Sequence, residues 1–584
     1  MRLLTALFIF INCFFVHSLY AQVEIEHGFL QKSGRYFINN SGPILLKSLN
    51  VGGWMLQEGY MMHSQKTANA QHELEAKLAD LVGEAGKEQF YDAWLNNHCT
   101  RRDVDSIAAW GFNSIRLPMH YKLFTPPIEK EPIQGEMTWR NKGFALVDSM
   151  VTWCKANQLY LILDLHAAPG GQGTDVPIAD YDKSKPSLWE SELNRAKTKA
   201  LWVKLAKRYA HEPTIGGYDL LNETNWAFES KDIHGCLEED NKPLKAFMVE
   251  LTEAIRAVDT THLIFIEGNC WANNFKGIWP PWDDKLVLSF HKYWSHNSQE
   301  SIQEFIDLAE KYGLPLYLGE SGENSNVWFT EAIRLFQQHN ISWAWWPMKK
   351  IASITNPCSI TLNDGYQNIL DYWETGRNKP SQMDALNSIM QLAENAKIEN
   401  CTIRYDLIDA LFRQINDVHT RPFKILSAPG VIRAVDFDMG RSGSAYADND
   451  SMNVWVSTGS KTIWNQGWAY RNDAVDIRYS EEQKGYVVDW TEKGEWMRYT
   501  FDVVTSGVYD FNLTASGKKG AISLLLDDRI NVGQMTTGNE GSGSWEVRLI
   551  GQSQLAKGRH VIKVKIDEPG LALSNIKVIM VNQD

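Results

Sequence analysis

The sequence predicts a (β/α)8 barrel of the TIM type followed by an all-β jelly-roll sandwich. Eight short apolar runs between residues 40 and 350 alternate with amphipathic stretches, as the strand–helix units of a closed barrel would. From about residue 429 the pattern changes to short alternating strands with Gly, Ser and Asn in the turns, which is typical of a β-sandwich. A doubly wound sheet is the alternative for the first region, but no glycine-rich phosphate turn follows its first strand.

The expected barrel strands are short and largely apolar, as buried parallel strands are. In chain order they are Leu45–Val51, Ser114–Pro118, Tyr160–His166, Gly217–Glu223, Leu263–Gly268, Leu286–Tyr293, Leu314–Glu320 and Ile341–Pro347. The amphipathic segments between them predict helices with one face on the barrel, namely Asp103–Trp110, Phe144–Asn157, Arg195–Ala210, Pro243–Val258, Ser301–Tyr312 and Asn326–His339.

The first 21 residues predict a cleaved secretory signal. Arg2 precedes an apolar stretch that ends at the small residue Ala21. A membrane anchor is the weaker alternative, because Asn12 and His17 interrupt a run that is already short. We therefore expect a secreted, periplasmic or cell-surface protein.

The remaining chain is expected to contain three segments. Residues 22–380 form the barrel and residues 429–584 form the sandwich. Between them, residues 381–428 are expected to be a structured linker, because Met383–Ala393 and Tyr405–Ile415 have helical patterns.

Composition excludes several classes of partner. The net charge is −13, from 58 basic and 71 acidic residues, and no basic tract occurs, so nucleic acid and anionic membrane surfaces are not expected as partners. No segment after the signal is apolar enough over a sufficient length to span a bilayer. The six cysteines after the signal have neither the spacing of a disulfide scaffold nor that of a zinc site, so most are expected to be buried thiols.

Polar residues stand at the C-terminal ends of six of the eight expected strands. They are Arg116, His166, Asn222, Glu223, His291, Tyr293, Glu320 and Trp346. In a barrel these strand ends form the face that carries the active site. Any one of these residues alone could be structural, but polar residues at so many ends of one barrel are hard to obtain by chance.

Two of these residues are glutamates, and paired carboxylates are what glycosidic bond cleavage requires. In a retaining glycosidase one carboxyl is the acid/base and the other the nucleophile, about 5 Å apart. The acid needs a raised pKa, whereas the nucleophile needs a cation and hydrogen-bond donors nearby, which Arg116 and Tyr293 could provide for Glu320. Asn222, next to Glu223, is suited to donate a hydrogen bond to the 2-hydroxyl of the sugar.

The ordered set of strand-end motifs resembles family 5 of the glycoside hydrolases. The resemblance covers residues 27–375 and is carried by Asn222-Glu223, Gly319-Glu320, Ile115-Arg116-Leu117-Pro118, Asp164-Leu165-His166 and Phe290-His291-Lys292-Tyr293. It implies that Glu223 is the acid/base and Glu320 the nucleophile. It also implies that Arg116, His166, Asn222, His291, Tyr293 and Trp346 surround the reacting sugar, with Trp346 as its floor.

Within that family, three segments are similar to the exo-acting β-1,3-glucanases. They are residues 49–58, 164–172 and 341–350. In that branch the glutamate matching Glu58 lies near the non-reducing-end hydroxyls of the glucose and helps to close the cleft, whereas the alternative for Glu58 is an ordinary loop acid. Gly59 stands where the branch has a proline, and Ser321 stands where it has an aromatic residue, so linkage and exo or endo mode stay open.

The C-terminal region resembles a family 6 carbohydrate-binding module. The resemblance is carried by residues 434–440, 443–448, 494–499, 555–560 and 573–576. It implies that Tyr486 and Asn575 contact a sugar, although the stacking tryptophan of that family has no match. Arg433 and Val435 stand where the family has calcium-binding glutamates. The alternative is a domain that mainly packs against the barrel.

Together these observations predict a retaining O-glycosyl hydrolase acting on a β-glucan, with β-1,3-glucan favoured. The alternatives are the same chemistry on cellulose, mannan, β-1,6-glucan or a glycolipid, and a non-catalytic carbohydrate-binding protein, which the presence of both glutamates disfavours. The chemistry requires no metal and no organic cofactor. Some loop aromatics are expected to be sugar platforms, the candidates being Trp226, Phe228, Trp271, Trp279, Trp282 and Trp294.

Overall fold

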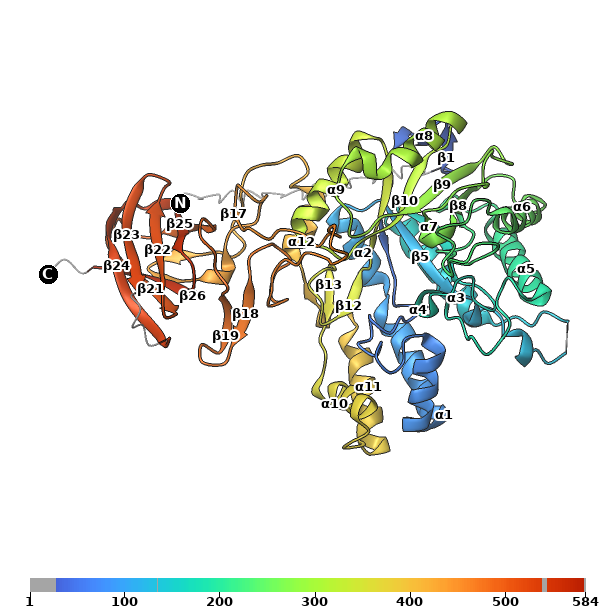
Figure 1. Cartoon of the computed structure of the whole chain (residues 1–584), viewed down its shortest axis with the longest axis horizontal. Helices are drawn as coiled ribbons and strands as arrows, with labels where there is room; N and C mark the ends of the chain where they lie inside the picture. Colours follow the sequence, from blue (N-terminus) through green and yellow to red (C-terminus); the bar gives the residue numbers. More distant parts are fainter. Residues whose placement is uncertain (1–27, 134, 538–542, 582–584) are drawn as a thin grey trace, which may run out of the picture.

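The protein consists of two lobes (Figure 1), a barrel with its helices and a strand-rich lobe drawn in orange and red. The structure, a computed structural model, describes residues 28–133, 135–537 and 543–581. The expected signal, residues 1–21, lies outside the described residues. Within the described ranges, no helix combines the length and the apolar character needed to cross a membrane.

Eight parallel strands close the barrel of the first lobe. They are β4 (Lys47–Asn50), β5 (Ser114–His120), β6 (Tyr160–Ala167), β7 (Ile215–Asp219), β8 (Leu263–Glu267), β9 (Leu286–His291), β10 (Leu316–Gly322) and β11 (Ser342–Trp346). Each strand pairs with its successor in the chain, and β11 pairs with β4 to close the ring. This confirms the predicted fold class.

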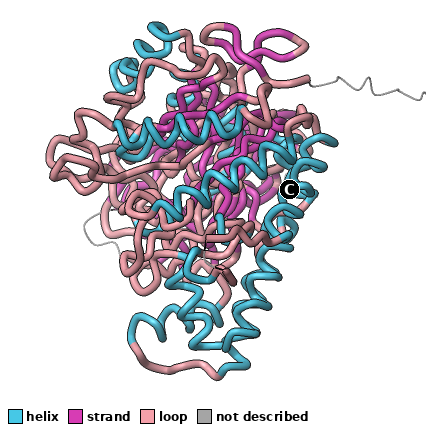
Figure 2. Tube along the Cα trace, turned by 90° about the vertical axis from the view of Figure 1, so that its right-hand side faces the viewer, coloured by secondary structure: helices cyan, strands magenta, loops and turns pink. Residues whose placement is uncertain are grey.

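Helices surround the strands on the outside (Figure 2). They include α2 (Arg101–Trp110), α3 (Asn141–Ala156), α5 (Glu192–Tyr209), α6 (Lys242–Arg256), α8 (Gln303–Tyr312) and α9 (Asn326–Gln338). Capping residues determine where these helices begin and end. Helix α2, for example, begins with a capping box between Thr100 and Asp103 and ends at Gly111, whose φ of 106° is a conformation that favours glycine.

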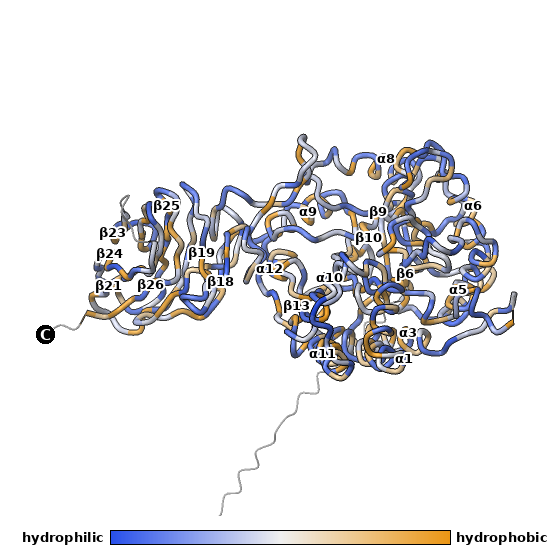
Figure 3. Tube along the Cα trace, turned by 60° about the horizontal axis from the view of Figure 1, so that its bottom comes forward, coloured by the Kyte–Doolittle hydropathy of each residue, from blue (hydrophilic) through white to orange (hydrophobic). Residues whose placement is uncertain are grey.

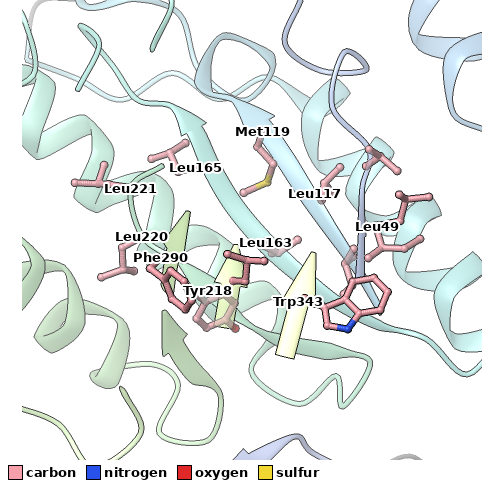
Figure 4. Packing of buried hydrophobic residues seen from close by; sticks show 14 of the residues in the cluster. Leu49, Leu117, Met119, Leu163, Leu165, Tyr218, Leu220, Leu221, Phe290 and Trp343 are labelled. Atoms are coloured by element: carbon pink, nitrogen blue, oxygen red, sulfur yellow. The ribbon is translucent and has the colours of Figure 1, made fainter. Parts of the chain in front are cut away.

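Alternate residues of each strand face opposite sides of the barrel wall. Hydrophobic stretches run through both lobes (Figure 3). The outward strand residues join the inner faces of the helices in one buried cluster, which includes Leu117, Leu163, Tyr218, Phe290 and Trp343 (Figure 4). Neighbouring inward residues are polar: Arg116 of β5 reaches across the interior to Glu267 of β8. The outer wall therefore provides the hydrophobic core, and the interior is left for polar groups.

A small hairpin sheet closes the end of the barrel where the strands begin. It consists of β1 (Gln31–Ser33), β2 (Tyr36–Asn39) and β3 (Gly42–Ile44). Phe37 stacks on the inward ring of Phe265, with 6.1 Å between ring centroids, inside a separate apolar cluster. This apolar plug leaves the C-terminal strand ends as the polar face.

Helix α12 (Tyr405–Phe412) occupies the position of the eighth barrel helix. It packs against α9, and the Phe412 ring contacts Phe112 at 4.9 Å and Trp343 at 6.0 Å between centroids. The outward face of β11 needs this cover because Trp343 would otherwise be exposed. Part of the segment expected to be a linker thus belongs to the barrel.

Three further helices form an extension below the barrel in Figure 1, namely α1 (Gln71–His98), α10 (Asp364–Thr375) and α11 (Gln382–Asn395). They share a hydrophobic core of their own. A small sheet connects this extension to the barrel and contains β12 (Lys349–Ile351), β13 (Cys358–Ile360) and β14 (Thr402–Ile403).

The second lobe contains two six-stranded sheets that share one hydrophobic core. One sheet contains β15 (Ser427–Ala428), β17 (Tyr446–Ala447), β20 (Trp496–Val503), β22 (Gly520–Leu526), β23 (Ile530–Thr537) and β25 (Gly558–Glu568). The other contains β16 (Gly430–Arg433), β18 (Ile477–Ser480), β19 (Gly485–Val488), β21 (Gly507–Ser516), β24 (Trp545–Leu555) and β26 (Ala572–Met580). Because residues of both sheets fill the shared core, the lobe is a sandwich, as predicted.

The two lobes are joined by buried contacts rather than by a tether alone. Asn472 of the second lobe donates to the carbonyl of Asn324 at 2.8 Å and to the side chain of Asn326 at 3.0 Å. Val454 of the second lobe belongs to the hydrophobic core of the barrel, and Val327 of the barrel packs against the core of the sandwich. Removing the second lobe would therefore expose part of the barrel core.

Lys349 holds three helices of the first lobe together from a fully buried position. Its ammonium lies 2.5 Å from the carboxylate of Asp103 at the start of α2. It also donates to the carbonyls of His98, at the end of α1, and Ala396, at the end of α11, both at 2.7 Å.

We predict that Lys349→Met lowers the free energy of unfolding by about 3–5 kcal/mol, because it leaves the Asp103 charge buried without its cation. A urea titration followed by tryptophan fluorescence measures the loss. Lys66→Met is the matched control: the Lys66–Glu374 pair has the same kind of contact, at 2.7 Å, but its side chains are 69% and 52% exposed. The control should lose at most about 1 kcal/mol, and equal losses in the two variants would contradict the prediction.

Candidate active site

The strand-end residues predicted from the sequence converge on one point at the C-terminal face of the barrel. Contacts between them link Glu58, Arg116, His166, Asn222, Glu223, His291, Tyr293, Glu320 and Trp346. Two predicted residues, Tyr486 and Asn575, lie in the second lobe. The barrel residues therefore form one site, and the two C-terminal residues are not part of it.

Glu223 and Glu320 are close enough for paired-carboxylate chemistry. One side-chain oxygen of each, together with a ring nitrogen of His291, lies in a group whose atoms are within 4.8 Å of one another. Both side chains are almost completely buried. This separation suits a direct nucleophile, because a water molecule between the carboxylates would require about 6.5–9.5 Å.

The guanidinium of Arg116 is the fully buried centre of the site. Its Nη1 donates to Glu320 at 2.8 Å, its Nε to Asp219 at 3.0 Å, and its Nη2 to Glu267 and to the Asn222 carbonyl oxygen, both at 2.9 Å. One cation thus orients one candidate catalytic carboxylate and the amide beside the other.

Sequence reasoning missed the carboxylates beneath the site, Asp164, Asp219 and Glu267. All three are buried, and Asp164 lies 3.2 Å from Arg116 Nη2. Burial raises the pKa of Asp219 to about 7, helped by the charge of Glu267 and opposed by Arg116. The available signal was an acidic residue at an inward position of an apolar strand, where packing alone would not place one.

Glu223 does not lie on its strand as predicted, because β7 ends at Asp219. The chain turns after the strand, and Glu223 adopts a φ of 42°, which is strained for a residue other than glycine. Its backbone N–H donates to Glu267 at 2.6 Å, and its carboxylate accepts from His291 Nδ1 at 2.6 Å. The surroundings thus hold both its backbone and its side chain.

His291 lies between two carboxylates. Its Nδ1 faces Glu223 at 2.6 Å and its Nε2 faces Glu267 at 3.1 Å. Burial lowers the pKa of His291, but Glu267, Glu320 and Glu223 raise it well above the ordinary value for histidine. The ring is therefore an imidazolium that donates from both nitrogens. A metal ion would need a lone pair on this ring, so the geometric grouping of His291 with the two glutamates does not suit metal binding.

The environment of Glu320 combines burial with three polar neighbours. Its second oxygen accepts a hydrogen bond from the Tyr293 hydroxyl at 3.2 Å. Burial raises the pKa of Glu320 to about 7, with His291 and Arg116 acting to lower it and the charge of Glu223 acting to raise it. The charge on Glu320 is therefore set by the protonation of the pair rather than by Glu320 alone.

His166 is the neutral counterpart of His291. Burial lowers its pKa to about 4. Its Nδ1 donates to Asp164 at 2.8 Å, which leaves Nε2 to accept from the Asn222 amide at 3.3 Å. Because the carbonyl oxygen of Asn222 accepts from Arg116, the Asn222 NH2 group is oriented and keeps one hydrogen for a ligand.

Trp346 and Glu58 both lie next to His166 in the site. The Trp346 ring stacks on His166, with 5.2 Å between centroids and 3° between planes, and its Nε1 donates to the Tyr60 hydroxyl at 2.7 Å. A Cβ on Gly52 would come within 2.5 Å of the Trp346 ring, so only glycine fits there. Burial raises the pKa of Glu58 well above its usual range, and the charges of Glu320 and Glu223 add to the increase.

Some of the loop aromatic residues that the sequence suggested as sugar platforms serve to pack the barrel instead. Trp279 is buried in the barrel core and stacks on Phe275, so it is not a sugar platform. The Cys236–Cys270 disulfide joins the loop after β7 to α7 (Asn269–Ala272), and the other four cysteines in the described ranges are free thiols. Trp294 follows Tyr293 directly in the chain.

In the second lobe, Tyr486 lies on β19 and Asn575 on β26 of the same sheet. The Tyr486 ring is 36% exposed and packs against the rings of Tyr470 and Tyr479. Arg433 pairs with Asp436 at 2.9 Å instead of contributing a ligand oxygen. Sugar binding by Tyr486 and Asn575 stays a prediction.

The barrel matches a known family and several characterised proteins. Residues 73–351 match the family model described as cellulase (glycosyl hydrolase family 5). A β-xylosidase of Phanerodontia chrysosporium is 29% identical over 42% of this chain and 48% of its own length. Endoglucanase C of Acetivibrio thermocellus is 27% identical over 52% of this chain and 91% of its own length. A probable glucan 1,3-β-glucosidase A of Aspergillus niger is 27% identical over 43% of this chain and 55% of its own length.

The chain thus spans about half the length of two of these relatives and nearly all of the third. The matched residues contain seven of the eight barrel strands in full, from β5 to β11. The similarity to the family 5 glycosyl hydrolases therefore lies in the barrel lobe of this chain.

Proposed function

We propose that the chain is a secreted retaining glycoside hydrolase that cleaves β-glucosidic bonds of a β-glucan by double displacement. The observation that supports it most is the separation of Glu223 and Glu320, whose oxygens lie within 4.8 Å in one buried site. Two carboxyl groups about 5 Å apart are the requirement of the retaining reaction.

In the first step, a carboxylate oxygen of Glu320 attacks the anomeric carbon while Glu223 transfers its proton to the departing glycosidic oxygen. The C–O bond to the leaving sugar breaks and an ester bond to Glu320 forms. In the second step, Glu223 accepts a proton from water, the water oxygen attacks the same carbon, and Glu320 is released as a carboxylate. The hydrogen bonds from Arg116 and Tyr293 favour that carboxylate as the leaving group.

Asn222, Trp346 and Glu58 are proposed to hold the reacting sugar. The free N–H of Asn222 is oriented for the 2-hydroxyl, a contact that strengthens in the transition state. Trp346 presents an aromatic floor for the sugar, and its ring is held by stacking on His166. Burial and the charges of Glu320 and Glu223 raise the pKa of Glu58, which favours the protonated form that can donate to a sugar hydroxyl. Its burial in the site supports this role over that of an ordinary loop acid.

The choice of β-glucan rests on the motifs of the barrel, with β-1,3-glucan favoured by the segments around Glu58, His166 and Trp346. Two of the relatives carry the names endoglucanase and glucan 1,3-β-glucosidase. Cellulose, mannan, β-1,6-glucan and glycolipids are the alternatives for the same chemistry. Secretion is proposed from the sequence of residues 1–21 alone.

The carboxylate assignment predicts that Glu320→Gln and Glu223→Gln each abolish hydrolysis without unfolding the protein. Glu320→Gln removes the attacking oxygen. Glu223→Gln removes the proton donor, which is worth about 10²–10⁴ in rate. Product release from a soluble β-glucan measures activity, and circular dichroism checks the fold. Full activity in both variants would refute the assignment.

The electrostatics of the pair predict the pH dependence. Hydrolysis of a glucan requires ionised Glu320 beside protonated Glu223, so kcat/KM should fall on both sides of an optimum that the coupled pair sets. Burial raises the pKa of Glu320, and the charge of Glu223 adds to the increase, so with a substrate whose cleavage needs only ionised Glu320 the acidic limb of Glu223→Gln should lie at lower pH than that of the wild type. A 2,4-dinitrophenyl β-glucoside allows the measurement in the variant, because its leaving group needs no proton. A limb that stays in place or moves to higher pH would contradict the coupling.

The cleavage mode is decided by sizing the products from a panel of oligosaccharides. We expect β-1,3-linked glucans to be cleaved faster than β-1,4- or β-1,6-linked glucans, mannan or an aryl β-xyloside. A role for Glu58 at the non-reducing end predicts glucose as the first product. Internal fragments as the first products would indicate endo cleavage instead.

A further inference from the structure

A hairpin of the second lobe lies against the loops of the barrel site. We call residues 453–462 the rim hairpin. Trp455 and Lys461 face each other in an antiparallel bridge, and the Val456 N–H donates to the Ser460 carbonyl at 2.9 Å. Val454 is buried in the barrel core, and Asn453 exchanges hydrogen bonds with Asn324 at 2.6 and 2.8 Å. The rim hairpin is therefore fixed to the barrel.

The rim hairpin contacts both the backbone and the ring of Trp294, which follows β9. The Trp455 N–H donates to the Trp294 carbonyl at 2.9 Å. The ammonium of Lys461 lies 3.2 Å from the centroid of the Trp294 ring and 4.9 Å from that of Trp455. One cation thus contacts two indoles, one from each lobe, and orients both.

Trp294 connects this pair to the candidate nucleophile. Its ring lies 5.3 Å from the ring of Tyr293, whose hydroxyl donates to Glu320 at 3.2 Å. Its Nε1 donates to the carbonyl of Glu323 at 3.3 Å. A chain of contacts through Trp294 and Tyr293 thus connects the rim hairpin to the candidate nucleophile.

Glu323 provides independent evidence that the rim hairpin borders the site. Burial lowers the pKa of Lys461 on the hairpin, and the negative charge of Glu323 acts against this decrease. The same charge adds to the raised pKa values of Glu58 and Tyr293, which burial mainly causes. A single carboxylate within electrostatic reach of all three groups places the hairpin beside the candidate active site.

We propose that Trp455, together with Trp294, forms a binding position for a glucosyl unit of the substrate chain outside the reacting position. The proposal rests on the proposed β-glucan substrate. Trp455 is 53% exposed although its backbone is held to the barrel, so its ring is not needed to cover a core. A fixed aromatic face binds the C–H surface of a sugar at little cost in ordering. The second lobe thereby contributes a residue to substrate binding beside the site of the first.

The test is calorimetric titration of full-length protein with hexasaccharides and disaccharides, β-1,3- and β-1,4-linked, in a Glu320→Gln background. Adding Trp455→Ala should raise the Kd of the preferred hexasaccharide about three- to tenfold and leave that of the disaccharide unchanged. Trp496→Ala is the matched control, because Lys563 lies 4.1 Å from its ring within the second lobe. The control should change neither Kd.

Unchanged hexasaccharide binding by Trp455→Ala, absence of hexasaccharide binding, or equal weakening for both chain lengths would overturn the proposal. Equal weakening would show that Trp455 serves only to dock the lobes. Failure of the proposed function gives a different result, since wild-type protein would then release no products from either glucan. Because binding is measured without turnover, the two failures are distinguishable.

Discussion

The buried guanidinium of Arg116 is the interaction on which the rest of the site depends. Carboxylates in a barrel interior are costly to bury unless a cation and hydrogen bonds compensate them. Arg116 supplies both, because its nitrogens reach Asp219, Glu320, Glu267 and the Asn222 amide at 2.8–3.0 Å. The apolar wall outside the strands carries the hydrophobic core, so the interior is free to hold this charged cluster. The hydrophobic core thus lies outside the layer of barrel strands, and the charged site lies inside it.

The acids beneath the site act on the two candidate catalytic glutamates in different ways. Glu267 accepts from the strained backbone of Glu223 and faces one nitrogen of His291. His291 uses its other nitrogen for Glu223, so backbone and side chain of that glutamate are oriented through one shared carboxylate. Glu320 is held from a different side, by Arg116 and Tyr293. Two chemically identical side chains are thereby given different surroundings, which is how a pair of carboxyl groups acquires separate roles.

The second lobe is packed against the barrel lobe and is not an independent domain on a flexible linker. Asn472 and Val454 are buried against the barrel, and the rim hairpin reaches Trp294. For this reason, point substitutions reveal more about the second lobe than its removal would. The family match, over residues 73–351, does not extend to the second lobe.

The sequence by itself determined the fold class, the paired glutamates and the residues around them. Those signals are local: strand-length apolar runs recur along the chain, and motifs such as Asn222-Glu223 occur at their ends. The tertiary structure alone decided that α12 takes the eighth helical position, that Glu267 supports Glu223, and that Trp455 lies beside Trp294. In each case the partners are far apart in the chain, and their contact depends on how loops and lobes pack. No periodicity or spacing within a single segment encodes such a contact.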